Sequence, residues 1–386
     1  MARVWQSGFE LNSLTANVEL TSLTGTGSIQ TSIVRSGSYA LRCNPTAATG
    51  FILKVLQASD QAIVGYARAY IYIVAYPDTV NNILTFQNSA SANQGHLRLN
   101  PNGTLIIANS TQTQIGSATA ALALNQWYMI ELKNDATTSP GTLTGQLGGI
   151  QFASGANNVQ GSWYQFRVGS ASSGRTCDLY FDDIAVNDAS GSFQNSWPGA
   201  GKIIHLKPDA AGDSSQWVPT SGANYTNVDE ITPNDATDLV SDVVLNESDM
   251  YNVAGSGIGS MDTTNVVMVG VRFRNDVADA TTQFKAQIEK ASGGTISQSA
   301  AITPNSTTWK TNGLAAPFTY PIILYQDPDS INWTRDTLET MQIGQKSTLI
   351  GVNKNQVSAV WASVDYMPYY PKSLVMSQAM NRMATY

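Results

Sequence analysis

Hydrophobic and polar residues alternate with a period of two over many short stretches of this chain, which is the pattern of β-strands that bury one face. In SYALR, Tyr39 and Leu41 alternate with smaller or polar residues. A longer strand is predicted over residues 64–76, where tyrosines recur. In WYMIEL (127–132), both faces of the predicted strand carry large side chains, as in the middle of a sandwich.

Turn signals separate these runs. Asn102-Gly103 lies between HLRLN and TLIIAN and predicts a β-hairpin. Turns recur every eight to twelve residues or so, a spacing typical of an antiparallel sandwich. Further strands are expected at SGFEL (7–11), SIQTS (28–32), GTLTGQLGGIQFA (141–153) and within residues 161–188, where FDDI (181–184) is expected to end the first domain.

Length and composition agree with an all-β protein. A chain of 386 residues is long for one core and predicts two domains, with three as the alternative. Charged residues make up 13% of the chain, about half the roughly 25% of an average globular protein. Long helices carry many charged residues on their exposed face, so we expect short strands and little helix.

The order of these strands resembles the concanavalin A-like jelly roll of the lectin and laminin-G superfamily. The resemblance covers residues 1–190 and is carried by SYALR, the tyrosine-rich strand, the Asn-Gly hairpin, WYMIEL and LYFDDIAV. It implies that residues 39–43 lie beside residues 177–184. Cys43 and Cys177 would then come within bridging distance, where a disulfide is one alternative and two free thiols, expected in a cytoplasm, are the other.

A stretch rich in Ser, Gly and Pro, residues 191–202, is interpreted as a linker. A second β-rich domain is expected over residues 203–368, with clear strands in NVVMVGVRFRND and TTQFKAQIEK. Residues 369–386 are interpreted as a C-terminal arm, in which Met376, Met380 and Met383 recur at helical spacing.

The second domain resembles segments of tailed-bacteriophage structural proteins. The matching runs are QWVP (216–219), NYTNVDE (224–230), NDATDLV (234–240) and DPDSINWT (327–334), followed by QIG (342–344). The phage run usually carries Thr-Gly where this chain has Asp329-Ser330, so the turn differs while Trp333 and Thr334 remain.

Charge excludes some partners. The net charge is −7, and residues 209–271 contain ten acidic side chains with no Lys, Arg or His. Such a surface repels nucleic acid and anionic membranes. It is interpreted as a solvated acidic face, with a cation site as the alternative. No signal peptide or membrane span is expected.

The patterns of common catalytic sites are absent from the sequence. Paired glycosidase carboxylates on one strand, a G-x-S-x-G elbow, phosphate-binding glycine loops and zinc spacings do not occur, and His96 and His205 are the only histidines. We therefore expect no enzyme, no catalytic residues and no cofactor. Asp182 and Asp183 are candidates for a calcium site. The alternative is that they accept backbone hydrogen bonds. Adjacent residues on a strand point to opposite faces, so the two aspartates are not expected to act as a pair.

Taken together, the resemblances imply a bacteriophage virion structural protein, such as a capsid decoration, head fibre or tail appendage protein, assembled in the host cytoplasm. Its expected partners are other virion proteins, further copies of itself and host surface glycans. The alternatives are a separate carbohydrate-binding lectin-like protein and an unrecognised glycan hydrolase.

Overall fold

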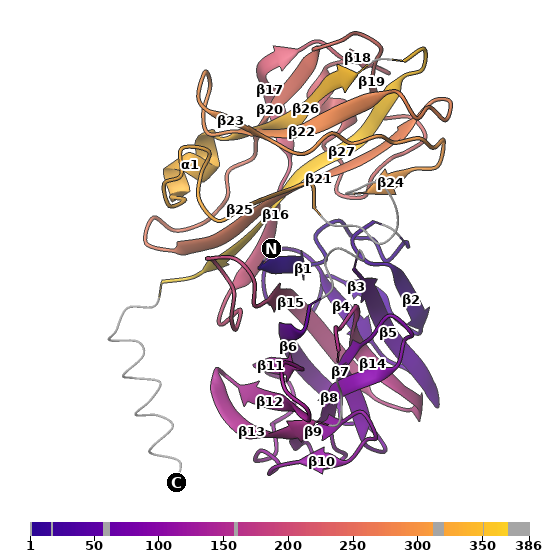
Figure 1. Ribbon diagram of the computed structural model, residues 1–386, viewed down its shortest axis with the longest axis vertical. Helices are drawn as coiled ribbons and strands as arrows, with labels where there is room; N and C mark the ends of the chain where they lie inside the picture. The colour runs from indigo at the N-terminus through magenta and orange to yellow at the C-terminus, as the bar shows by residue number, and fades with distance from the viewer. Residues whose placement is uncertain are drawn as a thin grey trace.

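The chain folds into two β-sandwiches, one above the other in Figure 1. The computed structural model describes residues 2–16, 18–56, 62–157, 161–311, 320–349 and 351–369. The N-terminal strand lies at the junction of the two sandwiches (Figure 1). Most of the predicted C-terminal arm, including its three methionines, lies outside the described residues.

The first sandwich consists of two antiparallel sheets. Sheet A has the order β13 (Ile150–Asn157), β12 (Gly141–Leu147), β11 (Trp127–Asp135), β6 (Val64–Ala75), β15 (Asp178–Asp188), β4 (Ala40–Cys43) and β3 (Ser28–Gln30), and β1 (Arg3–Ser7) also pairs with β15. Sheet B has the order β10 (Gln114–Ile115), β9 (Leu105–Asn109), β8 (Asn93–Leu99), β7 (Asn81–Gln87), β14 (Gln165–Arg175), β5 (Ala48–Val55) and β2 (Ser22–Gly25).

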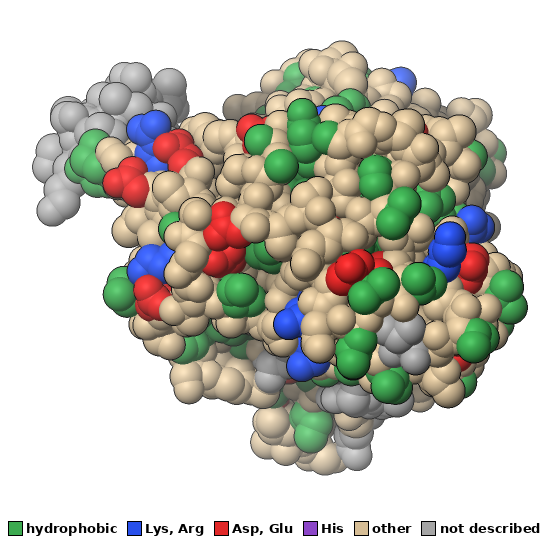
Figure 2. All heavy atoms as spheres, turned by 90° about the horizontal axis from the view of Figure 1, so that it is seen from above, with side chains coloured by type: hydrophobic (Ala, Val, Ile, Leu, Met, Phe, Trp, Pro, Cys, Tyr) green, Lys and Arg blue, Asp and Glu red, His purple; other side chains and the backbone are tan. Residues whose placement is uncertain are grey.

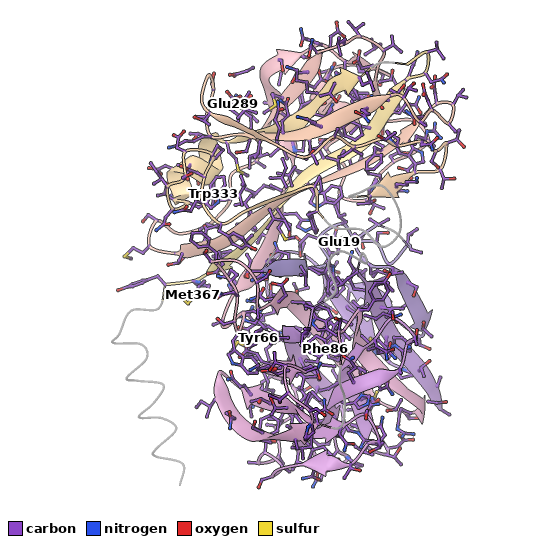
Figure 3. All side chains as sticks on the ribbon, in the orientation of Figure 1. Glu19, Tyr66, Phe86, Glu289, Trp333 and Met367 are labelled. Carbon is purple, nitrogen blue, oxygen red and sulfur yellow. The ribbon has the colours of Figure 1, made fainter. Side chains whose placement is uncertain are left out.

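Alternate residues of these strands form the core between the two sheets. In β6, Ala67, Ile71 and Ile73 point inward, so Tyr66, Tyr70 and Tyr72 lie on the outer face of sheet A. On sheet B, the buried Phe86, which Figure 3 labels within the first sandwich, packs edge-on against Trp163, with ring centroids 5.0 Å apart. Aromatic burial of this kind is a large part of the free energy that holds the sheets together.

The second sandwich also consists of two antiparallel sheets. One has the order β18 (Val218–Pro219), β19 (Val240–Asp242), β27 (Asn355–Met367), β21 (Thr263–Asn275) and β24 (Lys310–Thr311), with β16 (Lys202–Leu206) on β27 and β25 (Ile322–Leu324) on β21. The other has the order β17 (Pro208–Ser215), β20 (Ser248–Val253), β26 (Gln342–Leu349), β22 (Gln283–Glu289) and β23 (Ile296–Gln298). Within the described residues of this sandwich, the helical elements are a 3₁₀ turn, Asn224–Asn227, and α1 (Arg335–Thr340).

The all-β prediction is confirmed, and so are several local predictions. Strands β8 and β9 form the hairpin around Gly103, whose φ is +81°. Strand β4 pairs with β15, as the jelly-roll resemblance implies. No helix in the described part of the chain is long and apolar enough to cross a membrane.

Two predictions about strands and charge are wrong in detail. SGFEL is not a strand, because β1 ends at Ser7 and the buried Phe9 has a φ of +62°, which turns the chain. The acidic segment is not wholly solvated, since Asp249 is buried and accepts hydrogen bonds from the Gln216 and Trp217 amides and the Asn224 side chain. Seen from the second sandwich, the surface is mostly uncharged, and its hydrophobic side chains are dispersed (Figure 2).

Candidate functional site

The junction of the two sandwiches contains a buried group of charges. The Asp365 carboxylate on β27 lies 2.8 Å from an Arg3 guanidinium nitrogen and 3.1 Å from one of Arg68, and all three side chains are fully buried. Arg3 comes from β1 and Arg68 from β6, so both cations of this cluster belong to the first sandwich. The Gln6 side chain also donates to the Ser363 carbonyl at 3.1 Å. Charge pairing therefore joins the two domains directly.

The protonation of Asp365 follows from its neighbours. Burial raises the pKa of a carboxyl, but the attraction of the Arg68 and Arg3 guanidiniums outweighs it and lowers the pKa of Asp365 below its ordinary value. Asp365 is therefore ionised wherever the protein is folded near neutral pH.

Asp182 and Asp183 lie at a point where strand β15 changes partners. Residues 179–181 of β15 pair with β4, whereas residues 184–187 pair with β1. The register with β6 shifts between Asp182 and Ala185, and Asp183 has a φ of +50°. The two aspartates therefore occupy a β-bulge between two partner strands.

Because of this bulge, the expectation that the two aspartates point to opposite faces is wrong. Both carboxylates bind the same loop residues. Asp182 Oδ2 accepts from the Arg35 amide at 2.9 Å, while Asp183 accepts from the Arg35 guanidinium and from the Ser36 hydroxyl at 2.5 Å. Burial, followed by the charge of Asp183, raises the pKa of Asp182 well above its ordinary value.

These contacts bear on the calcium hypothesis. Asp183 Oδ1 also accepts from the Ile203 amide at 2.5 Å, and Asp182 Oδ1 accepts from the Asp183 amide at 2.7 Å, so all four carboxylate oxygens have donors. Among the described residues, no group of three or more His, Cys, Asp or Glu side chains could hold a metal ion. A calcium ion here would have to displace the Arg35 guanidinium. Calcium binding stays a hypothesis, which addition of calcium can test.

The predicted linker lies on the outer face of sheet A. Trp197 packs edge-on against Tyr66, with ring centroids 5.5 Å apart. The Gly199 amide donates to Glu131 at 3.0 Å, and Arg68 donates to the Gly199 carbonyl at 3.1 Å. A Cβ atom at Gly201 would lie 2.3 Å from an Arg68 nitrogen, so glycine is required there. The segment thus covers one part of the sheet.

Beyond the linker, the outer face of sheet A carries a row of aromatic rings. Tyr72 lies 5.5 Å from Trp127 and 6.3 Å from Tyr180, measured between ring centroids. The Arg42 guanidinium lies 5.5 Å above the Tyr180 ring and forms an ion pair with Asp178. Tyr72 and Trp127 are half-buried. We refer to Tyr72, Trp127 and Tyr180 as the aromatic strip.

Two further aromatic rings of this sandwich, those of Trp163 and Tyr70, are covered by other residues. Trp163 is buried in the core, and the Arg35 guanidinium carbon lies 3.2 Å from the centroid of Tyr70. The Tyr128 hydroxyl accepts from the Ala123 amide at 2.8 Å.

A cavity of about 200 Å³ lies between the sandwiches, close to Glu19, which Figure 3 shows at the junction. Glu10 lines it from the first sandwich and accepts hydrogen bonds from the Ser38 and Tyr39 amides. His205 and Glu230 line it from the second sandwich. Burial is the main cause that raises the pKa of both Glu10 and Glu230 to about 7.

Cys43 and Cys177 are both buried free thiols in the structure. Cys43 lies opposite Leu179 in the β4–β15 pairing, two residues from Cys177. The neighbourhood implied by the resemblance is confirmed, and a bond between them stays a prediction. His96 has a structural role: it is buried between Thr85, 3.0 Å from its Nδ1, and Gln112, 2.9 Å from its Nε2.

Sequence reasoning did not identify Arg3, Arg68 and Asp365 as a group. Each is a single charge in an apolar run, within MARVW, YARAYIYIV and WASVDYM. Charges are seldom fully buried without a partner, so such isolated charges are the signal that could have suggested a buried ion pair. The sequence does not say which charge pairs with which.

Comparison with known proteins adds little to this description. No protein family and no curated protein matches the chain. Among solved structures, the cellulose-induced protein Cip1 is 13% identical, with a TM-score of 0.37, over 50% of this chain and 99% of that one. Domain 4 of AbnA, an extracellular arabinanase from Geobacillus stearothermophilus, is 12% identical, with a TM-score of 0.33, over 48% and 93%.

A sialidase is 8% identical, with a TM-score of 0.33, over 43% of this chain and only 16% of its own length. The sialidase of Trypanosoma rangeli is 14% identical, with the same TM-score, over 48% and 30%. Likenesses this low carry no argument about function. The chain is therefore described by its own geometry, as two antiparallel β-sandwiches joined by a buried charge cluster.

Proposed function

We propose that this chain is a structural protein of a tailed-bacteriophage particle: a capsid decoration, head fibre or tail appendage protein without enzymatic activity. It would work through its shape and its contacts with other virion proteins and further copies of itself. The observation that carries the proposal is the joint between the sandwiches, where the Arg3, Arg68 and Asp365 side chains are fully buried. Such a joint holds two domains in one fixed arrangement, as a particle component requires.

The residues that resemble phage structural proteins support this proposal by their positions. Trp217 is buried and its amide donates to Asp249 at 2.9 Å. Trp333 is also buried, and Thr334 caps the N-terminus of α1 by accepting from the Thr337 amide at 3.2 Å. These residues stabilise turns of the second sandwich. The similarity therefore concerns how this domain is built.

Mass spectrometry of purified phage particles from the source of this gene tests the proposal. We expect the chain in a fixed molar ratio to the major head or tail protein, and retained after the particles are washed at high salt. Its absence from intact particles would overturn the proposal.

A second candidate function, lectin-like glycan binding, is favoured by the aromatic strip. Half-buried rings such as Tyr72 and Trp127 offer flat apolar faces to the faces of sugar rings, and the neighbouring Arg42 and Asp178 offer polar contacts. The strip would serve adhesion to a host surface glycan in a virion protein, or binding in a separate lectin-like protein.

A glycan array with the full chain tests this second function. We expect Trp127→Ala to abolish binding to the glycans that the wild-type chain binds on the array. Trp309→Ala is the matched control, because Trp309 stacks with Arg274 in the second sandwich, far along the chain from the strip. Equal loss of binding in both variants, or no glycan binding by wild type, would contradict the proposal that the aromatic strip binds glycans.

A further inference from the structure

The cavity between the sandwiches contains polar groups whose hydrogen-bonding capacity is not used. The His205 side chain is 6% exposed; its Nε2 lies 3.2 Å from Glu19, while its Nδ1 has no partner among the described residues. Glu230 Oε2 is buried and likewise lacks a partner in the described part of the chain. Buried polar atoms are normally satisfied by protein, water or a ligand, so these atoms indicate a place where another molecule binds.

Opposite charges share this cavity without pairing with each other. Lys207 lines it together with Glu10 and Glu230, yet no ion pair of Lys207 occurs among the described residues. Because Lys207 and the two glutamates line one space while their charged groups remain more than 4 Å apart, a molecule in that space can reach both charges. That molecule would carry a positive group toward the glutamates and a negative group toward Lys207.

Apolar side chains form another part of the cavity wall. Leu11 lines it from the first sandwich, and Ile231 and Trp361 line it from the second. The Trp361 ring stacks on that of His205, with centroids 6.3 Å apart and planes inclined by 26°. A small apolar side chain fits against such a wall, with its charged groups toward Glu230 and Lys207.

Size and charge narrow the class of ligand. The cavity volume of about 200 Å³ is below the ~300 Å³ of the smallest drug-sized pockets, so the ligand is small. A free anion would face Glu10 and Glu230, and a free cation would face Lys207. A molecule of amino-acid size that carries both charges avoids either repulsion.

We propose that this cavity binds a small zwitterion, a free α-amino acid with an apolar side chain. Glu230 accepts from its ammonium group, and Lys207 with the free His205 nitrogen binds its carboxylate. The ligand contacts both sandwiches and so stabilises their docked arrangement. This site is separate from the aromatic strip, and it stands whether or not the chain is part of a phage particle.

Calorimetric titration and thermal unfolding of the full chain test the proposal, with leucine and phenylalanine as probes. N-acetyl-leucine lacks the ammonium group, leucinamide lacks the carboxylate, and glucose is a neutral polyol. We expect one or both amino acids to bind and to raise the Tm, and each blocked analogue to bind at least tenfold more weakly. No binding of either amino acid, equal binding of the blocked analogues, or tighter binding of glucose would overturn the proposal.

Variants then locate the ligand. Glu230→Gln and Lys207→Met should each weaken amino-acid binding at least tenfold, whereas Trp127→Ala, which alters the aromatic strip, should leave it unchanged. Loss of binding in Trp127→Ala with retention in Glu230→Gln would place the ligand elsewhere and overturn the proposal. The indole N–H resonances of the wild-type chain give a readout that needs no cavity variant, since ligand in the cavity should shift the signal of Trp361.

Discussion

At the scale of single residues, Asp365 has a large expected effect on stability. Its carboxylate is the anion of the buried charge cluster and lies between two guanidiniums. We expect Asp365→Asn to lower the free energy of unfolding by about 3 to 5 kcal/mol, because two buried cations lose their counter-charge. Equilibrium unfolding in urea measures this loss.

Asp178→Asn is the matched control for that measurement. Asp178 pairs with Arg42, and these side chains are 18% and 31% exposed. Water screens this pair, so its loss should cost about 1 kcal/mol or less. Equal effects of the two substitutions would show that the buried cluster has no special role in stability.

The cavity glutamates should make stability depend on pH. The pKa of Glu10 rises from 4.5 to about 7 in the folded chain, mainly by burial, and that of Glu230 rises likewise. Between these values the folded chain binds more protons than the unfolded chain, so the free energy of unfolding should fall as pH rises. The lowered pKa of Asp365 acts below its ordinary value of 3.8, outside this window.

Urea unfolding from about pH 5 to about pH 8 checks this dependence. The double variant Glu10→Gln/Glu230→Gln should show a flatter dependence than wild type, and only the difference between the two curves is used. The charged neighbours of these glutamates, His205 and Glu19 beside Glu10 and Asp229 and Asp238 beside Glu230, are kept in the variant. Parallel plots of unfolding free energy against pH for the two proteins would contradict the raised pKa values of Glu10 and Glu230.

The aspartates of the bulge give a prediction about calcium. All four oxygens of Asp182 and Asp183 accept hydrogen bonds, one of them from the Arg35 guanidinium. We therefore expect millimolar calcium to leave the Tm of wild type unchanged. A rise in Tm that disappears in Asp183→Ala would instead establish the calcium site.

At the scale of elements, the strands were predictable from the sequence. The β-bulge at which β15 changes its partner strand was not. Alternation places WYMIEL and NVVMVGVRFRND correctly, because a period of two follows directly from strand geometry. The bulge at Asp183 depends on β4 ending and β1 beginning along the same edge of β15. Those partners lie some 140 to 180 residues away in sequence, and no local pattern contains them.

The pairing of β4 with β15 gives a prediction about the cysteines. Burial raises the pKa of the Cys177 thiol to about 11 and that of Cys43 still further. Since the thiolate is the reactive form, we expect neither thiol to be alkylated in the native chain and both to be alkylated in urea. A non-reduced mass lighter by two hydrogen atoms would show the disulfide instead.

At the scale of the whole molecule, the two sandwiches should unfold together. Besides the charge cluster, an apolar group joins them, in which Leu11 and Val18 pack with Met268, Tyr320 and Trp361. We expect a single calorimetric transition for wild type. Asp365→Asn should separate it into two, because the weakened interface no longer couples the domains. Two separated transitions in wild type would contradict this coupling.

The docking of the two sandwiches was not predictable from length and composition. Residues 191–202 have the composition of an exposed linker, yet Trp197 and Gly199 lie against sheet A. The candidate cavity was equally hidden, because Glu10 and Glu230 come from opposite sandwiches. Both features depend on contacts between distant segments, and periodicity does not report on those.

The positions of Arg3, Arg68 and Asp365 along the sequence also determine the order in which these buried charges are synthesised. Arg3 and Arg68 leave the ribosome early, whereas their counter-charge, Asp365, is among the last described residues to be made. A nascent chain that stops before residue 365 has two guanidiniums that cannot be buried without an anion. The surface of the first sandwich around Arg3 and Arg68 must therefore stay hydrated until β27 has been synthesised. Truncated chains that lack Asp365 cannot form the buried charge cluster between the sandwiches.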